Sequence, residues 1–151
     1  MSTIRELYQQ VIFDHYRRPH NNHEVPGADH SAEGRNPLCG DHVKLELRLE
    51  DGVVKEVGFR GEGCAITTAS ASMMTDVIKG KTVAEVEELF ERFHGMVSSS
   101  PTETANWSAN LGKLTVLAGV REFPARVKCA TLPWRTLFAA LRNVTETTST
   151  E

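Results

Sequence analysis

The sequence predicts an α+β domain in which a small three-stranded antiparallel sheet packs against helices on one side. Residues 43–49 alternate between apolar and charged side chains, and residues 53–60 repeat the alternation after a two-residue turn signal. This is the pattern of a hairpin with one buried face. Apolar residues also recur at helical spacing on both sides of the hairpin, at residues 2–16 and 82–94. Consecutive strands flanked by helices are typical of the α+β class.

The length of 151 residues suits one domain with a hydrophobic core, and 40% hydrophobic with 25% charged residues is ordinary for a globular protein. We expect residues 1–144 to form a single domain. Residues 145–151 are polar and rich in threonine, and we expect them to be a disordered tail.

The first predicted element is an amphipathic helix over residues 2–16, with Ser2 or Thr3 as its N-cap. Residues 21–38 contain several prolines and glycines among polar side chains. This composition predicts an extended loop that leads into Cys39.

The hairpin is the clearest local signal. Residues 43–49 and 53–60 form its two strands, and Asp51-Gly52 favours the tight turn between them because that turn requires positive φ. Residues 64–66 are then expected to add a short third strand. That assignment places Cys64 at a sheet edge or a tight bend.

Two helices are expected next. Small and apolar residues at 67–79 predict a helix that Gly80 ends. Thr82 and Glu85 have the spacing of a capping box, and the helix that they begin is expected to end at His94.

The last third of the chain has weaker signals. Residues 98–108 are expected to be a polar linker, and residues 111–117 a short buried helix. Residues 124–129 are expected to be extended or irregular. The last helix is expected at residues 132–144, with Pro133 in its first turn.

Composition and charge argue against several functions. Seventeen Lys and Arg against 20 Asp and Glu give a formal net charge of −3, so we expect neither nucleic acid nor a membrane surface as partner. The basic run at residues 15–20 is a solvated helix end or a docking point for a protein. No apolar stretch approaches the roughly 18 residues of a membrane span. The first residues are charged where a signal peptide is apolar, so we expect a soluble, cytoplasmic protein.

The three cysteines are the strongest functional signal. Cys39, Cys64 and Cys129 each lie at the boundary of a predicted element. An odd number of cysteines in a reducing compartment favours metal binding or redox chemistry over a disulfide framework. Cys39 and Asp41 flank a glycine, so both side chains can turn toward one ion, and Zn²⁺ accepts such ligands. The spacing alone is not that of a zinc finger, and three unrelated cysteines are the alternative.

The predicted meander brings Cys39, Asp41 and Cys64 to one edge of the sheet, where a C-terminal helix can deliver Cys129. Three thiolates and a carboxylate favour nearby cations, which Arg126 and Lys128 can supply while lowering the pKa of a free thiol. These two basic residues can equally be a solvated pair on a loop. His42 is a further possible ligand, or a strand residue that faces solvent.

The three cysteines lie in the segments 36–41 (NPLCGD), 61–66 (GEGCAI) and 126–134 (RVKCATLPW). Together these segments resemble the IscU/NifU-like family of iron–sulfur cluster assembly proteins, and more narrowly its SufU branch. The resemblance covers nearly the whole chain and implies the SufE/NifU-like fold. IscU scaffolds carry a histidine ligand at the position of Lys128, and the segment around residues 98–108 is lengthened relative to them. Both features favour the SufU branch.

The resemblance implies that Cys39, Asp41, Cys64 and Cys129 bind Zn²⁺. It also implies that Cys39 accepts persulfide sulfur from a pyridoxal-phosphate-dependent cysteine desulfurase of the SufS type, for downstream iron–sulfur assembly proteins. The protein would then be a sulfurtransferase-like carrier in which zinc holds the site together and protects the thiols. One alternative is a scaffold for a transient [2Fe–2S] cluster held by the same thiols. Another is a non-catalytic, zinc-stabilised interaction module.

Overall fold

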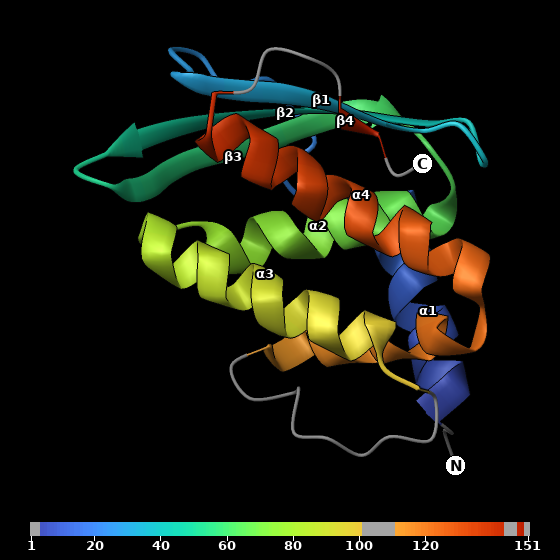
Figure 1. Ribbon diagram of the computed structural model, residues 1–151. Helices are drawn as coiled ribbons and strands as arrows, with labels where there is room; N and C mark the ends of the chain where they lie inside the picture. The colour runs from blue at the N-terminus through green and yellow to red at the C-terminus, as the bar shows by residue number, and fades with distance from the viewer. Residues whose placement is uncertain (1–3, 101–110, 144–147, 150–151) are drawn as a thin grey trace.

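The computed structural model describes residues 4–100, 111–143 and 148–149, and the structural statements below concern these residues. A sheet with strand order β3-β2-β1-β4 forms one layer, and the helices cover one of its faces (Figure 1). The elements follow in the order α1 (Ile4–Arg17), β1 (His30–Asn36), β2 (Asp41–Glu50), β3 (Val53–Glu62), α2 (Ala65–Ile78), α3 (Val83–Ser98), the 3₁₀ helix η1 (Gly112–Glu122), α4 (Pro124–Leu141) and β4 (Thr148–Ser149). The predicted α+β class, with three antiparallel strands packed against helices, is confirmed.

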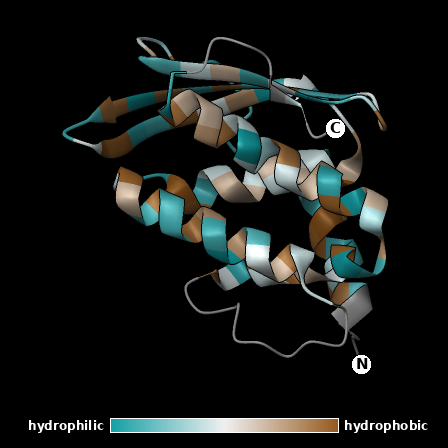
Figure 2. Cartoon of the chain, viewed as in Figure 1, coloured by the Kyte–Doolittle hydropathy of each residue, from teal (hydrophilic) through white to brown (hydrophobic). Residues whose placement is uncertain are grey.

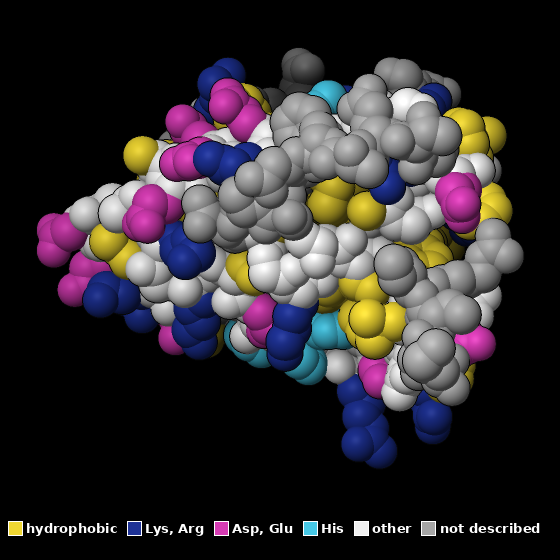
Figure 3. Space-filling model, turned by 90° about the horizontal axis from the view of Figure 1, so that it is seen from below, with side chains coloured by type: hydrophobic (Ala, Val, Ile, Leu, Met, Phe, Trp, Pro, Cys, Tyr) yellow, Lys and Arg dark blue, Asp and Glu magenta, His cyan; other side chains and the backbone are white. Residues whose placement is uncertain are grey.

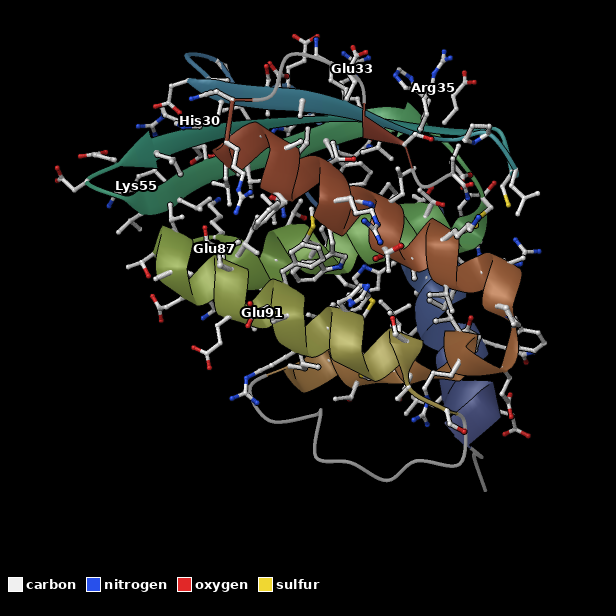
Figure 4. All side chains as sticks on the ribbon, viewed as in Figure 1. His30, Glu33, Arg35, Lys55, Glu87 and Glu91 are labelled. Atoms are coloured by element: carbon white, nitrogen blue, oxygen red, sulfur yellow. The ribbon has the colours of Figure 1, made fainter. Side chains whose placement is uncertain are left out.

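The sheet has one buried and one exposed face. Leu45 and Leu47 of β2 are fully buried beneath the helices, and Leu45 pairs with Phe59 of β3 in the predicted hairpin. Glu33 and Arg35 of β1 point away from the helices (Figure 4). The apolar positions that the alternating sequence pattern predicted to be buried therefore do form the inner face of the hairpin.

The third strand is not the predicted one. It is β1, which lies within the expected loop at 21–38 and pairs antiparallel with β2, whereas residues 64–66 begin helix α2. The inward positions of β1 are Ala32, Gly34 and Asn36, so the strand shows no apolar alternation. Packing against α4 explains the small side chains, because a Cβ atom at Gly34 would overlap Thr136 Oγ1.

Gly34→Ala should lower the free energy of unfolding by about 1–3 kcal/mol, because the added methyl group overpacks the contact between β1 and α4. The same methyl group would lie 3.0 Å from Leu132 Cδ1. Urea unfolding measures the loss. Thr136→Ala removes the nearest clashing atom, so the double variant should recover part of it. Equal stability of Gly34→Ala and the wild type would contradict this packing.

Helix α4 begins earlier than predicted. It starts at Pro124, so residues 124–129 are helical rather than irregular, and Pro133 lies inside the helix instead of in its first turn. Proline suits the first turn of a helix, which explains the start. Inside the helix, Pro133 has no N–H to donate to the carbonyl of Cys129. The helix continues because its buried face, centred on Trp134, packs in the core.

The core lies between the sheet and α3. Trp134 is fully buried and stacks on Phe93 with ring centroids 4.7 Å apart. Hydrophobic and hydrophilic positions alternate along α3, as its amphipathic sequence requires (Figure 2). The capping box of Thr82 and Glu85 is confirmed, but the helix extends to Ser98, beyond its predicted end at His94.

Other segments differ from the expectations or lie outside the described residues. The predicted short helix at 111–117 is present as the longer 3₁₀ helix η1. Residues 101–110, which form most of the expected linker, are outside the described part of the chain. Within the expected disordered tail, Thr148–Ser149 instead form β4, which pairs in parallel with Gly34 and Arg35. Within the described ranges, no helix is both long and apolar enough to cross a membrane.

Helix α1 is attached to α2 through histidines of the basic run. Ser72 Oγ lies 2.7 Å from His15 Nδ1 and accepts a hydrogen bond of 2.7 Å from the backbone N–H of His20. His20 Nδ1 lies 2.5 Å from Asp76 Oδ2. Figure 3 shows histidine side chains gathered beside lysine and arginine side chains on the face seen from below. The basic run at residues 15–20 therefore ends helix α1 and also holds this helix against α2.

The contact that His15 makes between α1 and α2 should make the free energy of unfolding depend on pH. Burial, with the neighbouring His20, lowers the pKa of His15 below its usual 6.5. Below that pH the unfolded chain binds more protons at this site than the folded chain, so stability is fully present above about pH 6.5 and falls as pH decreases. His15→Gln should reduce the drop in Tm between pH 7.5 and 5.5 by roughly 2–4 °C. An identical drop in both proteins would contradict this role.

Candidate metal centre

Three parts of the fold meet at one end of the sheet, and each carries a cysteine (Figure 1). Cys39 lies in the turn between β1 and β2, Cys64 is the N-cap residue of α2, and Cys129 lies on α4. The turn is closed by a hydrogen bond of 3.2 Å from the Cys39 N–H to the Asn36 carbonyl. Gly40 follows at φ +69°, a conformation that glycine adopts without strain.

Possible metal ligands converge at this end. One donor atom from each of Cys39, Asp41 and Cys129 lies within 4.8 Å of the others. The sulfur atoms of Cys39 and Cys129 are 3.4 Å apart. Two sulfurs and a carboxylate oxygen at such distances suit a tetrahedral divalent metal. The sequence predicted a site of these three residues together with Cys64, which is not part of this group. Metal binding itself stays a prediction.

Asp41 is the fixed centre of the cluster. The residue is 2% exposed, and its carboxylate accepts three hydrogen bonds: from the Cys64 N–H (2.8 Å), Thr67 Oγ1 (2.8 Å) and Asn36 Nδ2 (3.2 Å). Gly63 allows the approach, because a Cβ there would lie 3.0 Å from Asp41 Oδ1. The carboxylate therefore ties the start of β2 to the N-terminus of α2.

Cys64 lies beside this group and contacts Cys129. A hydrogen bond from the Cys129 thiol lowers the pKa of Cys64 to about 5, with a smaller contribution from Thr67. The same hydrogen bond, together with burial, raises the pKa of Cys129.

The three thiols differ in accessibility. Cys39 is exposed, Cys64 is half-buried and Cys129 is fully buried. The Arg126 guanidinium hydrogen-bonds to Cys64, and the negative charge of Cys64 raises the pKa of Arg126. Lys128 is exposed on α4, and we find no contact of its side chain with the thiols among the described residues. Of the two predicted cations, Arg126 is the one at the site.

Some residues of the site were not foreseen. Asn36 donates to both Asp41 Oδ2 and Cys129 Sγ, the latter at 3.5 Å, and Thr67 joins Asp41 to Cys64. Asn36 belongs to the NPLCGD segment, but nothing in the sequence distinguishes Thr67 from Thr68. His42 lies elsewhere, since its Nε2 is 3.5 Å from Glu33 Oε2 on the outer face of the sheet.

Fold and site together define a class of small α+β domain that gathers three cysteines and an aspartate at one end of its sheet. Residues 7–130 match the family described as "NifU-like N terminal domain". The chain therefore belongs to the NifU-like N-terminal domain family.

Curated relatives span most of the chain. It is 42% identical over 136 residues to the zinc-dependent sulfurtransferase SufU of Bacillus subtilis, covering 90% of each protein. It is 37% identical over 142 residues to the iron–sulfur cluster assembly scaffold protein IscU of Streptococcus pyogenes, covering 94% of this chain and 87% of that protein. Among solved structures, a putative iron–sulfur cluster assembly scaffold protein for the SUF system from Fervidobacterium islandicum matches with a TM-score of 0.80 and 33% identity, covering 87% of this chain and 94% of that one.

Proposed function

We propose that this chain is a zinc-dependent sulfur-transfer protein that accepts persulfide sulfur on Cys39 for iron–sulfur cluster biogenesis. The donor would be a pyridoxal-phosphate-dependent cysteine desulfurase of the SufS type, and the sulfur would pass to later assembly proteins in the cytoplasm. The observation that carries the proposal is the accessibility of Cys39: it is the exposed thiol of a cluster whose other members are half-buried or buried. The relative at 42% identity, named as a zinc-dependent sulfurtransferase, supports it.

The transfer is a thiol–persulfide exchange. The Cys39 thiolate attacks the outer sulfur of the persulfide on the desulfurase, and a new bond forms between Cys39 Sγ and that sulfur. The sulfur–sulfur bond of the donor breaks, and the desulfurase cysteine leaves as a thiolate. The outer sulfur keeps its oxidation state, so no external oxidant or reductant is required.

The donor set of Cys39, Asp41 and Cys129 fits zinc. Cys64, whose N–H donates to Asp41, would be the fourth residue that holds it. Zn²⁺ bound there would keep the thiols deprotonated and shielded until one of them is released. Asp41 fixes the frame, because its three hydrogen bonds join β2, α2 and Asn36. Arg126 offsets the negative charge next to Cys64.

The test is to mix the full chain with a cysteine desulfurase, supply cysteine, and map persulfides by mass spectrometry after alkylation. We expect one sulfur atom added at Cys39. Sulfur absent from Cys39 while the desulfurase carries its own persulfide would contradict the proposal, and would leave a zinc-stabilised interaction module as the better reading.

A second candidate is a scaffold for a transient [2Fe–2S] cluster, which the relative named as an IscU scaffold favours. Cysteine ligands with a labile fourth ligand suit such a cluster. Metal analysis of the purified chain followed by anaerobic reconstitution separates the two functions. Stoichiometric zinc without a stable visible absorption supports sulfur transfer, whereas a stable cluster supports the scaffold.

A further inference from the structure

Two histidines of the basic run lie side by side at the surface. The ring centroids of His15 and His20 are 4.7 Å apart, and the ring planes are inclined by 52°. His15 is half-buried and His20 is exposed. Both line a surface pocket of about 330 Å³, on the face where Figure 3 shows histidine side chains gathered. Their contacts with α2 account for one nitrogen of each ring and leave the other nitrogen without an assigned role.

Residues of α2 orient both rings. Ser72 Oγ lies 2.7 Å from His15 Nδ1, and Asp76 Oδ2 lies 2.5 Å from His20 Nδ1. Ser72 and Asp76 are four residues apart on the helix, so they lie on the same face and hold the rings next to each other. Both Nδ1 atoms face α2, and the Nε2 atoms on the other side of each ring therefore face away from it. Among the described residues, neither Nε2 atom has a hydrogen-bond partner.

This arrangement is the one that metal-binding histidines show. Such a histidine uses one ring nitrogen for a hydrogen bond to a carboxylate or another oxygen, which orients the ring and leaves the second nitrogen for the metal. The Asp76 carboxylate does this for His20. Burial and the neighbouring His20 lower the pKa of His15 below its usual 6.5, which keeps that ring neutral at pH 7.

The spacing of the rings also suits a shared ion. Two imidazoles that bind one ion at about 2.0–2.1 Å through nitrogen have their ring centres about 5 Å apart. The observed separation of 4.7 Å is close to this value. Because His20 is exposed, its ring can make the small adjustment that brings the two Nε2 atoms onto one ion.

The charges around the pair favour one class of ion. Two carboxylates and three cations surround it: Asp14, Asp76, Arg17, Arg18 and Lys113. Mg²⁺ and Ca²⁺ require a shell of oxygen ligands, which this nearly balanced set of charges does not supply. Imidazole nitrogens instead suit divalent transition ions such as Zn²⁺, Ni²⁺ and Cu²⁺.

We propose that His15 and His20 form a second metal site, separate from the cysteines, which binds a divalent transition ion through the two Nε2 atoms and completes its coordination with water. The inference goes beyond the proposed function and does not depend on it, because no cysteine takes part. Ser72 and Asp76 connect the two ligands to α2. A bound ion would therefore hold the end of α1 and the turn after it against α2.

The experiment uses the full-length chain without a histidine tag, after addition of one equivalent of Zn²⁺ for the cysteine site. Ni²⁺ is the probe, titrated by calorimetry at pH 7.5 and followed by the NMR signals of the imidazole rings. His20→Gln removes one ligand at an exposed position. His23→Gln is the matched control, because His23 is also exposed and its Nδ1 contacts only the carbonyl of Glu24. Asp76→Asn tests the orientation of the His20 ring, and circular dichroism checks that each variant is folded.

The wild type and His23→Gln should bind one Ni²⁺ more than His20→Gln. Asp76→Asn should bind this ion about 10–100-fold more weakly. Ni²⁺ should broaden the ring signals of His15 and His20 before those of the other histidines. At a concentration one hundred times its Kd, Ni²⁺ should raise the Tm of the wild type by roughly 5–10 °C.

Equal binding of Ni²⁺ by the wild type and His20→Gln would overturn the inference, as would equal broadening of all six histidines. Unchanged affinity in Asp76→Asn would contradict the orientation of the ring by α2. Every variant keeps the three cysteines, so any Ni²⁺ that the thiols bind cancels in these differences. Sulfur acceptance at Cys39 is measured separately, and its failure would leave this result standing.

Discussion

Cys39→Ser is expected to abolish sulfur acceptance and leave a folded domain. The side chain is exposed in a turn, so its replacement removes little packing. A serine hydroxyl cannot replace the thiolate that attacks the persulfide, so the transfer rate should fall by a factor on the order of 10³ or more. The measurement is the rate at which sulfur leaves the desulfurase persulfide for the chain, followed by mass spectrometry.

Leu38→Ala is the matched control, because it changes an exposed side chain in the same turn and leaves every sulfur in place. It should accept sulfur at Cys39 like the wild type. Full acceptance by Cys39→Ser would show that another thiol is the acceptor. Loss of acceptance in both variants would mean that the turn, rather than the thiol, is what the desulfurase requires.

Asp41→Ala should destabilise the fold by about 2–4 kcal/mol, because it leaves three donors without their buried acceptor. Asp41→Asn keeps the volume but places an amide NH₂ where the carboxylate accepts hydrogen bonds, so we expect a loss of about 1–3 kcal/mol. Both variants should also bind less zinc. Guanidinium unfolding and metal analysis of the purified proteins measure the two effects.

The control for this series is Thr67→Ser, which retains the hydroxyl donor to Asp41 and removes one methyl group. Its loss of stability should stay within about 1 kcal/mol, with zinc content unchanged. If Asp41→Asn were as stable as the wild type and held as much zinc, the carboxylate would not be the centre of the site.

Sequence patterns predicted the elements whose formation depends only on neighbouring residues. The hairpin after Asp51-Gly52 and the capping box at Thr82 need only neighbouring residues, and both are present as expected. Strand β1 was missed because its inward residues are small or polar, and only the position of α4 explains that choice. The early start of α4 was missed for a related reason: burial of the helix outweighs the proline within it.

The residues of the candidate site also divide into those that the sequence predicted and those that depend on the tertiary structure. The cysteines and Asp41 could be proposed from the sequence, because the chain has only three cysteines and Asp41 lies two residues after one of them. Thr67 could not, since its part depends on a hydrogen bond to a residue 26 positions earlier in the chain. The unequal exposure of Cys39 and Cys129 also follows only from the docking of α4.

Cys39 and Cys129 are 90 residues apart in the sequence, although their sulfur atoms are in contact. A covalent bond between them would close a loop that spans most of the chain and would restrict the unfolded ensemble, by about 4–5 kcal/mol in the chain-entropy description. The oxidised chain should therefore melt at a higher temperature than the reduced chain and resist proteolysis longer. Reduction would return it to a form that unfolds more easily.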